Sequence, residues 1–171
     1  MGLVNLYFDK ILIYNRFDII TAGKESEFLV SNSFYKTFDT YPRMMVHKCE
    51  MRVRYSDTDQ MKRMHHAAYA EYLEVARIEM LRSRGFSYAE MEKDGYILPV
   101  IHLQVRYLGG AEYDDVIRIE TIIHTRSEVR VAFESTIYID DRKIVEAEVE
   151  LACLDRDSWR PKRLPPGLCS Q

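Results

Sequence analysis

Residues 66–84 read HAAYAEYLEVARIEMLRSR and have the periodicity of an amphipathic helix. Apolar side chains recur at the i, i+3, i+4 and i+7 spacing that places them on one helical face. These side chains are Tyr69, Tyr72, Leu73, Ala76 and Met80. The other face is charged, with Glu74 and Arg77 spaced for an ion pair, and Gly85 is placed to end the helix. A helix of about 18 residues spans roughly 27 Å, enough to lie along a sheet and cover its apolar face.

The segments on either side of this helix have the period of β-strands. After it, apolar and polar residues alternate over 101–107, 117–123, 129–139 and 145–153, which predicts antiparallel strands with one buried face. Before it, MVHKCEMRVRY at 45–55 alternates in a similar way. The intervening SYAEMEKDG at 87–95 predicts a short second helix, with Ser87 as N-cap, Glu90 completing a capping box and Gly95 as the stop.

The order of these elements predicts an α+β domain, in which one long central helix is wrapped by a curved antiparallel sheet of about five strands. We place this domain at 45–168, after an extension of uncertain structure at 1–44 and before a short tail at 169–171. One helix covers such a sheet poorly at its edges, so we expect the chain to form a homodimer.

Composition excludes several classes of partner. The formal net charge of −3 comes without a long basic block, which argues against a nucleic-acid-binding surface. The apolar N-terminus, MGLVNLYFDKILIYNRFDII, is interrupted by charges and fits neither a signal peptide nor a membrane span. The three cysteines are far apart in sequence and form no CxxC pair, so we expect a reducing, cytoplasmic setting.

The segment YSDTDQMKRMHHAAY at 55–69 concentrates polar chemistry, and two interpretations of it stay open. In the structural one, SDTDQ forms an Asx turn and a helix cap, with Asp57 and Gln60 at capping-box spacing. In the functional one, no Ser, Thr, Asp or Asn between Met61 and His66 caps the helix, so its first amides are unpaired at the positive end of the helix dipole. Such amides can bind an oxyanion, and a neighbouring carboxylate can activate water or attack directly.

Other chemistries lack their sequence signatures. Adjacent histidines at 65 and 66 diverge by about 100° on a helix, and no HxxxH or HExxH spacing occurs, so we expect no metal site. The GxSxG elbow of serine hydrolases is absent, as are GxGxxG and the P-loop of nucleotide-binding proteins.

Three spaced motifs carry a family resemblance. Tyr55-x-Asp57-Thr58-Asp59, then His66-Ala67-Ala68-Tyr69, then Tyr72-x-Glu74-x-Ala76-Arg77 together resemble the 4-hydroxybenzoyl-CoA thioesterase family of hot-dog-fold acyl-CoA thioesterases. The segments LPV at 98–100 and VRYLGGAEYDD at 105–115 look like a second signature of that family. The resemblance extends from Met45 to about Leu168 and leaves the N-terminal extension without a counterpart.

The resemblance implies a hot-dog fold completed across a dimer, which in relatives often assembles further into a tetramer. It implies hydrolysis of an acyl thioester, with CoA as the leaving group and with no metal or cofactor. By position, Asp59 is the catalytic carboxylate, acting as general base or nucleophile, and the backbone N–H of His66 polarises the thioester carbonyl. The His66 side chain and Tyr55 match residues associated with the site, and Asp57 matches a supporting residue.

Further residues are expected at the substrate. Where relatives usually carry glycine, this chain has Lys62 and Arg63, so we expect ordinary backbone angles there, and either a reshaped pocket mouth or cations that attract CoA. Arg126 and Arg130 flank a turn near the CoA arm and are expected to meet its phosphates, and Tyr69 is expected to touch ligand. Two alternatives remain: a thioesterase for acyl groups on a carrier protein, and a non-catalytic acyl-CoA-binding protein.

Overall fold

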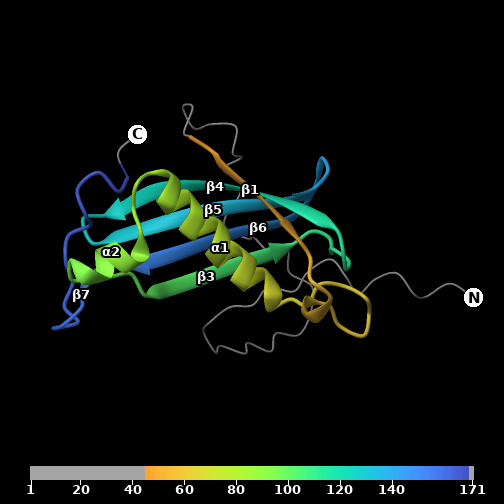
Figure 1. Cartoon of the computed structure of the whole chain (residues 1–171), viewed down its shortest axis with the longest axis horizontal. Helices are drawn as coiled ribbons and strands as arrows, with labels where there is room; N and C mark the ends of the chain where they lie inside the picture. The colour runs from red at the N-terminus through yellow and green to blue at the C-terminus, as the bar shows by residue number, and fades with distance from the viewer. Residues whose placement is uncertain (1–44, 170–171) are drawn as a thin grey trace, which may run out of the picture.

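One long α-helix lies across a five-stranded antiparallel sheet whose strand order is β1-β4-β5-β6-β3 (Figure 1). The computed structural model describes residues 45–169, so the predicted extension at 1–44 lies outside the described residues. The strands are β1 His47–Arg52, β2 Tyr96–Ile97, β3 Val100–Tyr107, β4 Val116–Ser127, β5 Arg130–Ile139, β6 Arg142–Ala152 and β7 Leu154–Asp155. The helices are α1 Ala68–Ser83, α2 Tyr88–Lys93 and the 3-10 turn η3 Tyr55–Asp57. The predicted α+β architecture, one long helix on an antiparallel sheet of five strands, is confirmed.

The sheet buries the face that the alternation predicts. Register pairs such as Ile119 with Ile137 and Phe133 with Val149 bring apolar side chains opposite one another, and all four are buried. Intervening positions such as Glu134 and Glu148 are only half-buried and carry ion pairs. Period-2 alternation therefore separates the core face of each long strand from its polar face.

The helix packs its predicted stripe into this core. All five stripe residues, from Tyr69 to Met80, are buried, and Gly85 ends the helix region at φ 83°. The expectation that Arg77 lies on the charged face is wrong, because Arg77 is only 6% exposed. Its Nε–H donates to the Tyr88 hydroxyl of α2 at 3.1 Å, so a contact between two helices draws the guanidinium inward.

The second helix begins where predicted but without the predicted cap. Ser87 is the N-cap residue of α2, yet its side chain makes no capping hydrogen bond, so the capping box with Glu90 does not form. The Ser87 carbonyl instead accepts the amides of Glu90 and Met91, at 3.1 and 2.9 Å. Gly95 follows at φ 79°, as its predicted role as a stop requires.

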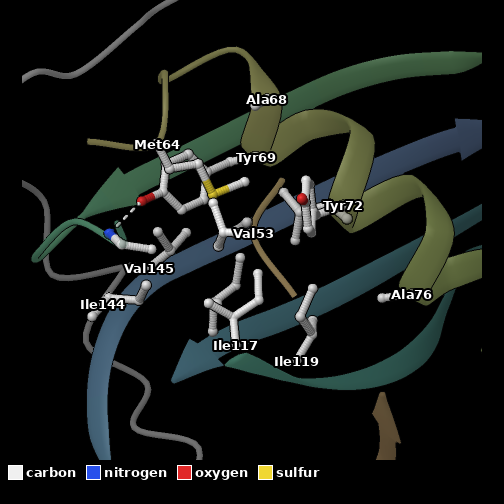
Figure 2. Close-up of a cluster of buried hydrophobic side chains, with 14 residues drawn as sticks. Val53, Met64, Ala68, Tyr69, Tyr72, Ala76, Ile117, Ile119, Ile144 and Val145 are labelled. Atoms are coloured by element: carbon white, nitrogen blue, oxygen red, sulfur yellow. Dashed lines mark hydrogen bonds between the residues drawn. The ribbon is translucent and has the colours of Figure 1, made fainter. Parts of the chain in front are cut away.

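The core consists of two clusters of buried side chains, one under each half of α1. The first contains Tyr69, Tyr72 and Ala76 with residues of β4 and β6, including Ile117 and Val145 (Figure 2). The second contains Met80 and Leu81 with Phe133, Leu151 and Leu168. The first cluster lies beneath the N-terminal half of the helix and so supports the loop that precedes it.

Strand β3 is an edge of the sheet with exposed apolar side chains. It pairs with β6 on one side, and no described strand pairs with its other side. Val100, Ile101 and Leu103 are 49%, 50% and 39% exposed. An unprotected edge of this kind is a template for pairing with another strand.

Candidate active site

The polar segment 55–67 forms a closed loop between β1 and α1. Residues 55–57 make the 3-10 turn η3, and the chain then loops away from this turn and comes back beside it. The return is fixed by a bridge between Thr58 and Met64, and by the amide of His65, which donates to the Asp57 carbonyl at 2.7 Å. The Asp59 amide donates to the Arg63 carbonyl at 2.9 Å. These bonds hold the segment that bears Asp59 directly before the N-terminus of α1.

Asp59 is half-buried, and its two carboxylate oxygens have different surroundings. Oδ1 accepts the amide of Met61 at 2.8 Å and that of Arg63 at 3.4 Å. Oδ2 has no hydrogen-bond partner among the described residues. An Asx turn therefore exists, but Asp59 forms it, and the predicted capping box between Asp57 and Gln60 is wrong because Asp57 lies in η3 instead. One oxygen orients the carboxylate while the other stays available.

The start of α1 leaves an amide unpaired. The helix begins at Ala68, two residues later than predicted, and its N-cap Ala67 makes no side-chain cap, as the absence of capping residues predicts. The Ala67 amide donates to His65 Nδ1 at 3.3 Å, whereas the amide of His66 has no acceptor among residues 45–169. Tyr107 of β3 donates its hydroxyl to the His66 carbonyl at 2.9 Å and so fixes that peptide from the other side.

Asp57 is the buried carboxylate of the loop, with a side chain that is enclosed by donors. Its Oδ2 accepts Arg54 Nε–H at 2.8 Å and the Tyr72 hydroxyl at 2.6 Å, and its Oδ1 accepts the Ser56 hydroxyl at 3.1 Å. The Arg54 hydrogen bond is the main cause that holds the pKa of Asp57 below its ordinary value, against the effect of burial. Asp57 is thus ionised and structural, in line with its expected supporting role.

Replacing Asp57 with Asn should produce a pH-dependent loss of stability. Because the pKa of Asp57 is lowered on folding, its charge stabilises the native state above the unfolded pKa of about 4 and loses that effect as pH falls through the folded pKa. We expect Asp57→Asn to cost on the order of 2 kcal/mol at pH 7. Urea unfolding at pH 7, 5 and 3 should show the gap to wild type narrowing toward pH 3. A gap that is constant with pH would contradict this assignment.

Lys62 and Arg63 depart from what the sequence predicts. The expected ordinary backbone angles are wrong, because Lys62 adopts φ 60°, the left-handed region that favours glycine. The turn closed by the Lys62 amide on the Asp59 carbonyl, at 2.9 Å, imposes this conformation. Arg63 forms an ion pair with Glu112 at 2.7 Å, so its charge is already partnered within the chain. Lys62 has no ion-pair partner among the described residues and stays a predicted contact for CoA.

Substitution of Lys62 tests this strained turn. A β-branched side chain is disfavoured at positive φ, so Lys62→Val should cost about 1 kcal/mol or more. Lys62→Gly removes the strain but gains unfolded-state entropy, and we expect it to leave stability within about 1 kcal/mol of wild type. Thermal unfolding should place the Gly variant close to wild type, and both above the Val variant. Equal melting temperatures for Gly and Val would contradict the observed turn.

Among the described residues, no hydrogen bond, ion pair or ring contact joins Tyr55, Tyr69, Arg126 or Arg130 to Asp59. Tyr55 is 77% exposed, with its ring edge-on to Tyr113 at 5.5 Å between centroids. Tyr69 is a core residue whose hydroxyl accepts the Ala111 amide at 3.2 Å (Figure 2). The β4–β5 turn, which carries Arg126 and Arg130, lies at the end of the sheet opposite to η3 (Figure 1).

Both arginines have acidic neighbours on the sheet. Arg126 pairs with Glu134 and Glu148, and Arg130 pairs with Glu150 at 3.3 Å. Their contacts with CoA, like that of Tyr69 with ligand, stay predictions. Sequence reasoning missed Arg54, whose only signal is its position three residues before the buried Asp57.

A helix laid on a curved antiparallel sheet, with a carboxylate-bearing loop before an uncapped helix start, defines the hot-dog thioesterase class. Residues 53–171 match the model of the Thioesterase-like superfamily. The chain therefore belongs to the Thioesterase-like superfamily. The prediction of a thioester hydrolase is confirmed at the level of this family, whereas the narrower 4-hydroxybenzoyl-CoA thioesterase family is not established by the match.

Individual relatives agree with this assignment. The chain is 31% identical over 119 residues to the putative acyl-CoA thioesterase YneP of Bacillus subtilis, an alignment that covers 69% of this chain and 86% of the relative. It is 31% identical over 122 residues to the acyl-CoA thioester hydrolase YbgC of Escherichia coli O6:H1, covering 71% and 91%. A DHNA-CoA thioesterase from Staphylococcus aureus superposes with a TM-score of 0.68 at 34% identity, covering 71% of this chain and 82% of that one. Among the described residues, no helix is long and apolar enough to cross a membrane.

Proposed function

We propose that this protein is an acyl-CoA thioesterase that hydrolyses an acyl thioester to a carboxylic acid and CoA. One observation carries the proposal: a closed loop bears the Asp59 carboxylate and ends at the backbone amide of His66, and within the described part of the chain neither Asp59 Oδ2 nor this amide has a hydrogen-bond partner. An amide donor at a helix start is suited to a carbonyl oxygen that becomes an oxyanion, and a carboxylate is suited to drive attack on the same carbon.

The chemistry needs only these two groups and a water molecule. With Asp59 as general base, Oδ2 takes a proton from water while the water oxygen bonds to the thioester carbon, and the carbonyl oxygen becomes an oxyanion at the His66 amide. Collapse of this intermediate breaks the C–S bond, and the thiolate of CoA takes the proton from Asp59. With Asp59 as nucleophile, Oδ2 bonds to the carbon and expels the thiolate, and water then hydrolyses the resulting anhydride.

The proposal includes the finer predictions that follow from the sequence. The chain acts as a homodimer, with β3 as the pairing edge, which can assemble further into a tetramer. Tyr55 and the His66 side chain line the site, and Lys62 and the two arginines of the β4–β5 turn meet CoA. The enzyme acts in the reducing cytoplasm, as its widely spaced cysteines indicate, and belongs to the 4-hydroxybenzoyl-CoA thioesterase branch of the family.

Release of free thiol from a panel of acyl-CoAs tests the function. The panel contains short, medium and long aliphatic chains together with benzoyl-type aromatic groups, and a thiol reagent reports free CoA. We expect turnover of at least one class by wild-type protein. Tight CoA binding in calorimetry with no thiol release from any substrate would identify a non-catalytic acyl-CoA-binding protein instead.

A carrier-protein substrate is the second candidate, and one comparison favours it. The chain is 30% identical over 121 residues to the acyl-acyl carrier protein thioesterase ATL2 of Arabidopsis thaliana, which covers 70% of this chain and 64% of that protein. The chemistry at the thioester carbon is the same with either handle. Assaying one acyl group on CoA and on carrier protein in parallel separates them, because the preferred handle should have the higher kcat/KM.

A further inference from the structure

The proposed reaction leaves the buried carboxylate of Asp57 without a chemical role. The carboxylate of Asp57 is ionised and only 8% exposed, and its hydrogen-bond partners are the donors of Arg54, Ser56 and Tyr72. Burying a carboxylate costs free energy that even good partners only partly offset, and apolar side chains of similar size are often equally stable. Stability alone therefore does not explain why a carboxylate occupies this position.

The side chain of Asp57 connects the loop to the helix. The Tyr72 hydroxyl of α1 donates to Asp57 Oδ2 at 2.6 Å and accepts the Arg54 amide at 3.2 Å. Tyr72 is itself buried, with its ring in the first core cluster, which also contains Val53 (Figure 2). The hydroxyl also lies 3.2 Å from the Arg52 carbonyl, so it joins three segments at one point: the end of β1, the turn η3 and the helix.

The backbone of Asp57 connects the same point to the proposed oxyanion donor. Its carbonyl accepts the amide of His65, the residue directly before His66, at 2.7 Å. Asp59 lies two residues after Asp57, in the part of the loop that this bond closes. Any movement of Asp57 relative to α1 therefore changes the position of both the Asp59 carboxylate and the His66 amide.

We propose that Tyr72 and Asp57 form a positioning pair, in which the Tyr72 hydroxyl sets the placement of the Asp59 loop and the His66 amide for attack on the thioester. This inference rests on the proposed thioesterase function. Neither residue touches the reacting atoms, because Asp57 is buried by its donors and Tyr72 by the core. A shift of about 1 Å in a catalytic group can reduce turnover about 100-fold, so a single hydroxyl is sufficient for a measurable effect.

The test is Tyr72→Phe, which removes one oxygen and keeps the ring that packs in the core. With the best acyl-CoA, we expect kcat to fall about 10- to 100-fold while KM stays within about threefold. Circular dichroism should show a folded protein that melts within a few degrees of wild type. The matched control is Tyr88→Phe, which removes a hydroxyl that bonds Arg77 near the other end of α1 and should leave kcat within about twofold of wild type.

Two further measurements distinguish positioning from a general loss of stability. In an Asp59→Asn background, Tyr72→Phe should lower kcat by a smaller factor than in wild type, because one of the two groups that it positions is already absent. By hydrogen exchange, the amides of Met61, Arg63 and His65 should exchange at least about tenfold faster in Tyr72→Phe than in wild type or Tyr88→Phe. This second measurement does not depend on activity.

The outcomes separate this inference from the proposed function. Absence of turnover by wild type on every thioester rejects the function, and the exchange rates still decide the placement role of Tyr72. An active wild type with an unchanged kcat in Tyr72→Phe rejects the positioning pair alone. A fall in kcat that matches the loss of folded protein also rejects it. A fall in kcat/KM that comes only from a higher KM, with kcat unchanged, rejects it as well.

Discussion

Asp59→Asn should reduce kcat/KM for an acyl-CoA by about 1,000-fold or more, the largest effect expected of any single substitution in this protein. General-base catalysis contributes about 10²–10⁴ in rate, and loss of a nucleophile costs at least as much. Asn keeps an Oδ1 that can accept the amides of Met61 and Arg63, so the loop should keep its conformation. The amide nitrogen then occupies the place of Oδ2 and can neither take a proton nor attack.

The measurement is thiol release under single-turnover and steady-state conditions, beside thermal unfolding of both proteins. Asp157→Asn is a charge-matched control, because Asp157 is an exposed aspartate of the C-terminal segment that pairs only with neighbouring Arg156 among the described residues. We expect this control to keep wild-type rates. Full activity in Asp59→Asn would reject the mechanism, whereas equal losses in both variants would point to an effect of net charge.

Placing lysines on the free edge of β3 should convert a dimer into monomers. The double variant Ile101→Lys/Leu103→Lys replaces two exposed apolar side chains on that edge with charges, which natural sheets use to prevent strand pairing. Loss of this pairing between chains should leave the core of each chain intact. Sedimentation velocity should show wild type at twice the mass of one chain and the double variant at the mass of one.

The opposite side of the sheet provides the control. Val46 is 46% exposed and precedes β1, the other edge strand, so Val46→Lys adds a similar charge where no pairing is proposed. This variant should sediment like wild type. Monomeric wild-type protein at micromolar concentration, or a double variant that stays dimeric, would reject β3 as the interface. If the partner completes the substrate site, thiol release should fall together with the dimer.

The sequence predicts the helices and strands of the fold well because every residue on the buried face of an element tends to be apolar. The stripe from Tyr69 to Met80 and the alternation in β4 and β5 each repeat one preference many times, so single exceptions do not obscure the pattern. Gly85 and Gly95 mark helix ends because few other residues adopt positive φ without strain.

Details that depend on one tertiary contact were not predictable. Arg77 is buried because Tyr88, eleven positions away, supplies an acceptor. The helical spacing of the sequence does not indicate that contact. Lys62 adopts positive φ because the surrounding turn imposes it, although the residue itself disfavours it. At the site, the uncapped helix start was predictable from the absence of capping residues, whereas the enclosure of Asp57 by Arg54 and Tyr72 required three separate segments to meet.

The division of the core into two clusters has a consequence for how this protein can change over time. Substitutions around Phe133, Leu151 and Leu168 alter packing under the C-terminal half of α1. This half lies more than two helical turns from the start of the helix, where the His66 amide is proposed to act with Asp59. Thermal adaptation can therefore accumulate at that end while the chemistry is conserved at the other. We expect directed evolution for heat tolerance to enrich mutations in the far cluster, and selection for new acyl groups to enrich them near β3 and the loop.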